Sequence, residues 1–186
     1  MADDAGQAQR TYKETIDHYR ELRQVVYEFT EDEFRSFGVK LGEIRYQDAV
    51  EADKWSGLWG EVERVPIWEW TRLYRDYHSH GGVKRFDVAV SAQGKLCALC
   101  YGVPSRKKLI LKLHALSRLP IHNPLEGKVL SIVLFAADAY ARLIDAEEMW
   151  LCNPMNEKLV NVYERAGFIP HRNNLGITTH LSLRLT

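Results

Sequence analysis

The stretch Glu148–Phe168, EMWLCNPMNEKLVNVYERAGF, decides the fold that this sequence predicts. It begins with a short apolar run, Met149–Cys152, which is typical of a buried strand. Asn153-Pro154 then indicates a turn. From about Met155 to Ala166 apolar residues recur with helical spacing. Gly167 follows, where a helix end favours a residue that tolerates positive φ. We therefore expect a strand, a turn and a helix in direct succession.

The predicted helix carries two polar residues on its apolar face. Asn156, Leu159/Val160 and Tyr163 fall at i, i+3/i+4 and i+7, so they share one side of the helix. One interpretation is a helix packed on a sheet, with a buried tyrosine bonded to a neighbour. The other is that the amide and the phenol face a reaction centre.

The pattern Asn-x6-Tyr-x3-Gly-Phe after a strand resembles the last helix of the GNAT superfamily, the acyl-CoA-dependent N-acyltransferases. In that family the asparagine and tyrosine face the cofactor thiol and the acyl-transfer centre. The resemblance thus implies that Asn156 lies at the cofactor and that Tyr163 is the general acid.

The order of the remaining elements agrees with this resemblance. Three strands joined by tight turns are predicted at Phe86–Val90, Lys95–Val103 and Leu109–Leu116, and a helix then runs from Val129 to Ile144. The final strand is Ile177–Leu185. The resemblance covers roughly residues 43–185. It implies an α/β (α+β) fold with a mostly antiparallel mixed sheet, a V-shaped splay and helices on both faces.

Two of the predicted strands should flank the splay. We expect Leu109–Leu116 and Met149–Cys152 to be parallel neighbours, because a helix of crossover length separates them.

The first part of the chain lies outside the resemblance. Residues 1–10 are acidic and polar, and we expect a disordered tail there. Apolar residues at helical spacing then predict an additional N-terminal helix within residues 11–37. Residues 11–186 have a length typical of a single domain.

Charge and cysteine content argue against several classes of protein. Twenty-five basic and twenty-five acidic residues leave no net charge, whereas a nucleic-acid binder would need a cationic surface. No apolar run has the length of about 18 residues that a membrane span needs, and the acidic N-terminus does not resemble a signal peptide. Three cysteines without a secretory signal favour a cytoplasmic location.

Two short motifs suggest metal or redox chemistry only weakly. Cys97 and Cys100 have CxxC spacing, but residues three apart on a strand project to opposite faces, so we expect buried strand cysteines. His78-Ser-His80 has no third ligand nearby in the sequence. We therefore predict no metal site.

The segment Leu119–Leu130 precedes the predicted helix at Val129–Ile144. In GNAT enzymes a Gln/Arg-x-x-Gly-x-Gly/Ala loop presents backbone N–H groups to the CoA pyrophosphate at this position, where a helix start offers unpaired donors. The resemblance places His122 at the Gln/Arg position, Leu125 in place of the first glycine and Gly127 at the second.

Considered by itself, the same segment predicts an ordinary capped helix. Asn123 is a good N-cap, Pro124 a good first helical residue, and Glu126 completes a capping box. Two interpretations therefore stay open. The helix start is either well capped or a degenerate CoA loop. In the second case acetyl-CoA is bound by a set of predicted cofactor residues: His122, Asn123, Leu125, Gly127, Lys128 and Asn156.

A general base and an oxyanion donor are predicted on the strand Leu109–Leu116, and an alternative base on the final strand. His114 projects from its mixed face and titrates in the range useful for a general base, although a buried structural histidine fits the same pattern. His180 is a second candidate base. The oxyanion is expected to meet a backbone N–H between Lys112 and Leu116.

Four tryptophans cluster in the middle of the chain and fit either a core or an acceptor pocket: Trp55, Trp59, Trp68 and Trp70. Pro66 can open a helix that runs to about Tyr77.

We therefore expect an N-acyltransferase that moves an acetyl group from acetyl-CoA to an amine of a small molecule or protein. Two alternatives are a catalytically inactive GNAT-fold binding or regulatory module and a GNAT-like enzyme that modifies nucleic acid. Nucleic-acid and membrane partners are not expected, and a homodimer is left open.

Overall fold

A computed structural model describes residues 11–58, 68–79 and 82–185. The predicted disordered tail, residues 1–10, lies outside the described residues. One seven-stranded sheet has the order β1-β2-β3-β4-β5-β7-β6, and every neighbouring pair is antiparallel except β4–β5. Its strands are β1 (Lys40–Gly42), β2 (Phe86–Ala92), β3 (Lys95–Pro104), β4 (Ile110–Arg118), β5 (Glu148–Cys152), β6 (Ile169–Arg172) and β7 (Thr178–Arg184).

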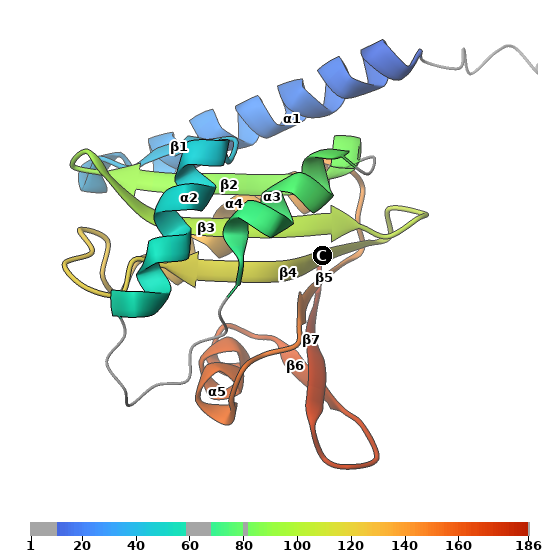
Figure 1. The fold of residues 1–186 in the computed structure, drawn as a ribbon. Coiled ribbons are helices and arrows are strands. Elements are labelled where there is room, and N and C mark those ends of the chain that lie inside the picture. Colours follow the sequence, from blue (N-terminus) through green and yellow to red (C-terminus); the bar gives the residue numbers. More distant parts are fainter. Residues whose placement is uncertain (1–10, 59–67, 80–81, 186) are drawn as a thin grey trace, which may run out of the picture.

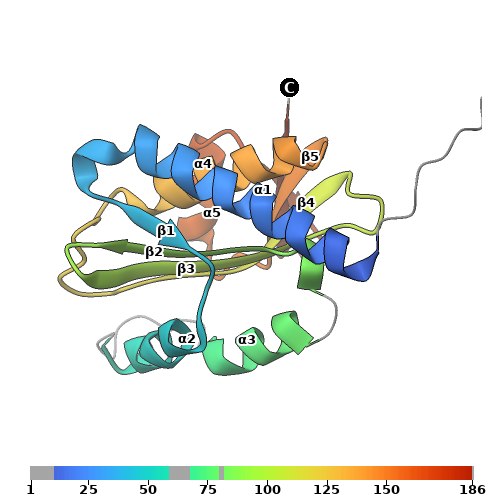
Figure 2. The same ribbon diagram turned by 90° about the horizontal axis from the view of Figure 1, so that it is seen from above.

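Helices cover both faces of the sheet, as predicted. Figure 2 shows α1 and α4 on one face and α2 and α3 on the other. In the described part of the chain, none of the helices combines the length and apolarity needed to cross a bilayer. The helices are α1 (Tyr12–Glu33), α2 (Tyr46–Asp53), α3 (Trp70–Ser79), α4 (Val129–Leu143) and α5 (Glu157–Arg165).

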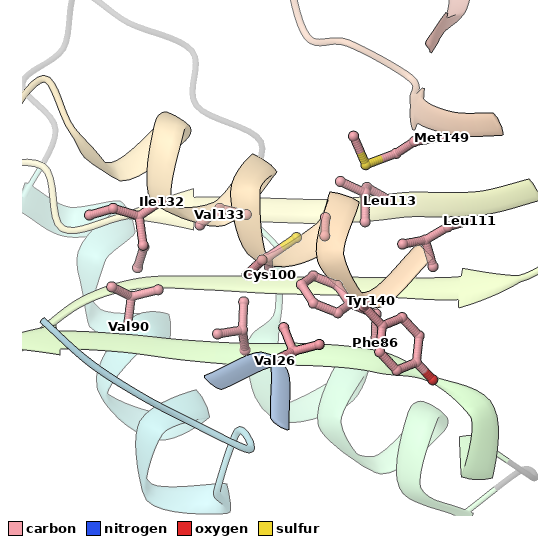
Figure 3. Close-up of a cluster of buried hydrophobic side chains, with 14 of the residues drawn as sticks. Val26, Phe86, Val90, Cys100, Leu111, Leu113, Ile132, Val133, Tyr140 and Met149 are labelled. Carbon is pink, nitrogen blue, oxygen red and sulfur yellow. The ribbon is translucent and has the colours of Figure 1, made fainter. Parts of the chain in front are cut away.

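The N-terminal helix α1 packs against the rest of the fold. A capping box between Thr11 and Glu14 begins it. Its C-terminal part packs against α4, where Phe29 stacks on Phe135 and Phe34 meets the same ring edge-on. The core beneath α1 and α4 joins residues from both helices and from β2 to β5, including Val26, Phe86 and Met149 (Figure 3).

A cluster of paired charges lies where α1 meets β1 and β2. Arg23, only 3% exposed, donates to the Glu43 carboxylate at 2.6 Å and lies 3.5 Å from the fully buried Asp87 carboxylate. Arg85 lies 3.0 Å from the same Asp87 oxygen, and the Tyr27 hydroxyl donates to the Asp87 carbonyl. We call Arg23, Tyr27, Glu43, Arg85 and Asp87 the charge cluster.

Strands β4 and β5 are parallel neighbours, which confirms the prediction, and they then part. Their pairing covers Ile110–Leu113 with Glu148–Leu151, whereas β4 continues to Arg118 beside β3 alone. Figure 1 shows β5, β6 and β7 diverging from β4, with α5 beside them. This divergence is the predicted V-shaped splay.

A β-bulge in β4 lies at the point of divergence. Tyr101 of β3 opposes Ala115 and Gly102 opposes Leu113, so His114 is the extra residue. A Cβ on Gly102 would lie 2.7 Å from Leu113 Cδ2 and 3.0 Å from the Lys112 carbonyl oxygen, so a larger residue would force its neighbours to shift. Leu113 joins the core beneath α4, but Ala115 joins the core beneath α2 and α3. The predicted regular alternation through His114 is therefore wrong.

The CxxC residues are buried and free, as predicted, but they do not project to opposite faces of the sheet. A register shift opposite Val90 and Ser91 makes Cys97 another bulge residue. Cys97 and Cys100 consequently join the same core, beneath α1 and α4, instead of projecting to opposite faces.

Candidate active site

An opening lies between β4 and β5 where the two strands part. Its cavity has a volume of about 50 Å³, enough for a group of a few atoms. The lining comes from four segments of the chain: Leu113–Leu116 of β4, Leu151–Met155 at the end of β5, Leu159 and Tyr163 of α5, and Trp68.

Tyr163 lines this opening as a buried phenol. Its side chain is 7% exposed and its ring meets Phe168 edge-to-face. Burial, with a smaller effect of Cys100, raises the pKa of Tyr163 to about 12, so the phenol keeps its proton at neutral pH. Within the described part of the chain, the Tyr163 hydroxyl makes no hydrogen bond, whereas those of Tyr27 and Tyr140 each donate to a backbone carbonyl.

His114 lines the same opening from the bulge in β4. Burial, and then the positive charge of Lys112, lower the pKa of His114 below its ordinary value of 6.5. The imidazole is therefore neutral at neutral pH and can accept a proton. The predicted alternative base, His180, does not line the opening. It stacks on Trp150 and His171 over the outer strands.

The backbone of β4 is also exposed to the opening. Beyond Leu113, β4 has no ladder partner on the β5 side. The stretch His114–Leu116 lines the opening together with Tyr163, and a backbone oxyanion donor within it remains a prediction.

Asn156 has a different position from the one predicted. The helix α5 begins at Glu157, later than predicted, and Asn156 is its N-cap, with Oδ1 accepting from the Leu159 amide at 2.9 Å. The exposed Asn156 side chain therefore does not share the buried face of Val160 and Tyr163. It is also absent from the lining of the opening. A cofactor contact of Asn156 remains a prediction.

Asn123 does not cap α4, so the prediction of a capped helix is wrong. Its amide donates to the carbonyls of Cys97 and Leu119, and its Oδ1 accepts from the Leu125 amide. The chain then turns through Gly127, which has φ +73°, before α4 begins at Val129. The N-cap residue is Lys128, and no side chain caps the helix.

The uncapped start of α4 leaves backbone donors available. The amides of Gly127, Leu130 and Ser131 have no hydrogen-bond partner within the described residues, whereas the Leu125 amide is engaged by Asn123. Open space surrounds the Gly127 Cα on its side-chain side. No side chain within the described residues caps these donors, so the start of α4 can accept an anion.

The side chains predicted around this helix start differ in access. His122 is exposed, at a left-handed φ of 51°. Lys128 is also exposed and its Nζ lies 5.5 Å from the centre of the Phe37 ring. Leu125 is buried, so its side chain belongs to the core and cannot contact a cofactor.

The described tryptophans fit both predicted roles, a place in the core and a place at a pocket. Trp55 and Trp70 are buried in the core beneath α2 and α3, and the Trp70 indole donates to Ser117. Trp68 lines the opening. Trp59, Pro66 and His80 lie outside the described residues. Among the residues that the structure describes, no three His, Cys, Asp or Glu side chains converge to hold a metal ion.

Solved structures share this architecture. No family model and no curated protein matches the sequence. A protein of Desulfovibrio desulfuricans assigned to the GNAT family of acetyltransferases is 16% identical with a TM-score of 0.59, over 80% of this chain and 99% of that one. A spermidine N-acetyltransferase chimera of Vibrio cholerae SpeG and hSSAT is 16% identical with a TM-score of 0.59, over 80% and 96%.

A third similar structure is the ribosomal-protein-S18-alanine N-acetyltransferase of Escherichia coli. It is 12% identical with a TM-score of 0.53, over 80% of this chain and 94% of that one. At these identities the likeness concerns the fold. The chain has the GNAT fold, as its sequence predicts.

Proposed function

We propose that this protein is an N-acetyltransferase that uses acetyl-CoA and an amine acceptor. The observation that carries the proposal is that Tyr163 and His114, from distant parts of the sequence, line one opening where β4 and β5 part. Both side chains are in the protonation state that acyl transfer to an amine requires, a protonated phenol and a neutral imidazole.

The residues of the opening divide the reaction between them. Acetyl-CoA supplies an acetyl thioester. His114 accepts the proton that the amine loses as its nitrogen forms the new C–N bond. A β4 amide donates to the carbonyl oxygen while negative charge develops on it. Tyr163 donates its proton to the sulfur as the C–S bond breaks, which leaves an amide and CoA.

The start of α4 is the proposed site for the CoA pyrophosphate. The unpaired amides of Gly127, Leu130 and Ser131 supply donors, and the helix dipole favours negative charge there. The exposed side chains of His122 and Lys128 are placed to contact the phosphates. The buried Asn123 acts indirectly, because it holds the loop against β3.

Binding is tested first with acetyl-CoA itself. Calorimetry should show heat of binding, and the melting temperature should rise with acetyl-CoA concentration through linkage. Acceptors are then found by screening amines, peptides and tRNA with labelled acetyl-CoA. No heat and no melting shift at millimolar acetyl-CoA would overturn the proposal in favour of an inactive binding module. Cytoplasmic location and homodimer formation remain predictions.

A further inference from the structure

The described lining of the opening lacks acidic side chains. Apolar groups dominate it: Trp68, Leu116, Leu151, Pro154, Met155 and Leu159. His114, Cys152, Asn153 and Tyr163 supply polar atoms, but within the described residues neither Asp nor Glu lines the opening. A bound cation would therefore meet no opposite charge from the described residues of the lining.

The charge that acts on the opening is positive. Lys112 lies on β4 two residues before His114, with its Nζ 5.1 Å from the centre of the Trp150 ring. Its ammonium lowers the pKa of His114 and, against the larger opposite effect of burial, that of Cys152. A second positive charge brought into this space would be repelled by Lys112 and would also lose its hydration.

Apolar surface at the rim favours a different kind of ligand. Met155 is 40% exposed although it lines the opening, and Trp68 faces it from the segment that precedes α3. An acceptor with an apolar body would cover Met155 and Trp68, which removes apolar surface from water.

We infer that the acceptor is a primary amine on an apolar body that carries no second positive charge. Two sources supply this chemistry: an alkyl- or arylalkylamine, and a peptide whose first residue is apolar. The inference rests on the proposed acetyltransferase function and names the substrate class of the same site.

The test compares acceptors that differ only in the second charge. Hexylamine and 1,6-diaminohexane have the same chain length, so release of the CoA thiol at saturating acetyl-CoA gives a matched ratio of kcat/KM. We expect the monoamine to be preferred at least about tenfold, because like charges placed close together are strongly disfavoured. Phenethylamine and an uncharged-side-chain peptide beginning with Phe distinguish the two sources.

Variants at Met155, at the rim of the opening, test whether charge causes the preference for the monoamine. Met155→Glu supplies a carboxylate and should reduce the preference for the monoamine by about two- to fivefold, the range of a partly exposed ion pair. Met155→Lys should increase the preference. Val162→Glu, on an exposed position of α5 outside the opening, is the matched control and should leave the ratio unchanged.

Each outcome decides between the inference and the proposed function. Equal or better acetylation of the diamine overturns the inference and leaves the acetyltransferase function standing. An unchanged ratio in both Met155 variants also overturns it. If no monoamine or peptide is acetylated, the inference fails, and calorimetry with acetyl-CoA then shows whether the proposed function fails with it.

Discussion

The charge cluster and the opening are two groups of polar side chains that differ in their partners. In the charge cluster, Arg23 and Arg85 compensate Glu43 and Asp87, and Tyr27 donates to a carbonyl. In the opening, Tyr163 and His114 make no hydrogen bond within the described residues. The ion pairs of the cluster hold α1 against the sheet, although Arg85 Nε and Asp87 Oδ1 are buried and make no hydrogen bond within the described residues. Tyr163 and His114 line the opening, where a ligand can contact them.

The largest expected effect comes from removing the hydroxyl of Tyr163. Tyr163→Phe keeps the ring packed against Phe168, so the fold should survive with a stability change near the ~1 kcal/mol of one hydrogen bond or less. Turnover should fall by roughly 10²–10⁴-fold, the usual worth of a positioned general acid. Steady-state kinetics with acetyl-CoA and an acceptor measures this.

Binding separates a catalytic role of Tyr163 from a packing role. Acetyl-CoA affinity should change far less than turnover, because the phenol acts as the thiolate leaves. Tyr140→Phe is a matched control, since it removes a hydroxyl that donates to the Lys84 carbonyl and interacts with Arg23, away from the opening. Parental turnover in Tyr163→Phe would show that the phenol merely packs.

In the charge cluster, by contrast, a substitution is expected to lower the stability of the fold. Asp87→Asn leaves Arg23 and Arg85 without their buried carboxylate, which should cost about 3–5 kcal/mol of unfolding free energy. Urea denaturation measures the loss. Asp17→Asn, in an exposed pair with Arg20, is the control and should change stability by less than about 1 kcal/mol. An Asp87→Asn protein as stable as the control would refute the structural role of the cluster.

The pH dependence of activity tests whether His114 in the opening acts as the general base. Because the pKa of His114 is lowered, the imidazole is neutral at pH 7, and kcat/KM should fall only as the pH drops below the ordinary histidine value of 6.5. Lys112→Gln removes a positive charge, so the pKa of His114 should rise and the acid limb should move to higher pH. Lys107→Gln, at the exposed turn before β4, should leave the limb in place. If the acid limb of kcat/KM lies at the same pH in Lys112→Gln as in the parent, His114 is excluded as the base.

The sequence was sufficient to predict the succession of β2, β3, β4, α4, β5, α5 and β7 along the chain, because periodicity indicates these elements, and crossover length predicted the parallel contact of β4 and β5. The strand β6 was missed, since Pro170 argues against a strand although an edge strand tolerates it. The buried Arg23 had a detectable signal. It falls at helical spacing between Tyr19 and Val26, on the buried face of α1.

The details of the site depended on contacts that a local pattern cannot contain. The bulge at His114 lies opposite Tyr101 and Gly102 of the neighbouring strand, and at Gly102 a side chain would crowd Leu113 and Lys112. Asn123 has the local signature of an N-cap, but carbonyls of Cys97 and Leu119 engage its amide. Local patterns thus named Tyr163 and His114, and long-range packing determined that both line one opening.

The smallest expected effect is on stability, and it distinguishes a structural role of Asn156 from a contact with the cofactor. Asn156 is paired, since its Oδ1 accepts from the Leu159 amide, so we expect a structural role. Asn156→Ala should lose about 1 kcal/mol of stability, the typical worth of an N-cap, whereas Asn156→Ser should retain most of it because serine also caps. Thermal unfolding compares the two variants with the parent.

Acetyl-CoA affinity then tells whether the cap is all that Asn156 provides. If capping is its role, both variants should bind acetyl-CoA as the parent does, and calorimetry at a temperature well below unfolding should show equal dissociation constants. A contact with the cofactor predicts instead that serine, although it restores stability, leaves affinity reduced, because its shorter side chain cannot reproduce an amide contact. Equal stability of Ser and parent together with weaker binding would therefore place Asn156 in the cofactor site despite its exposed position at the start of α5.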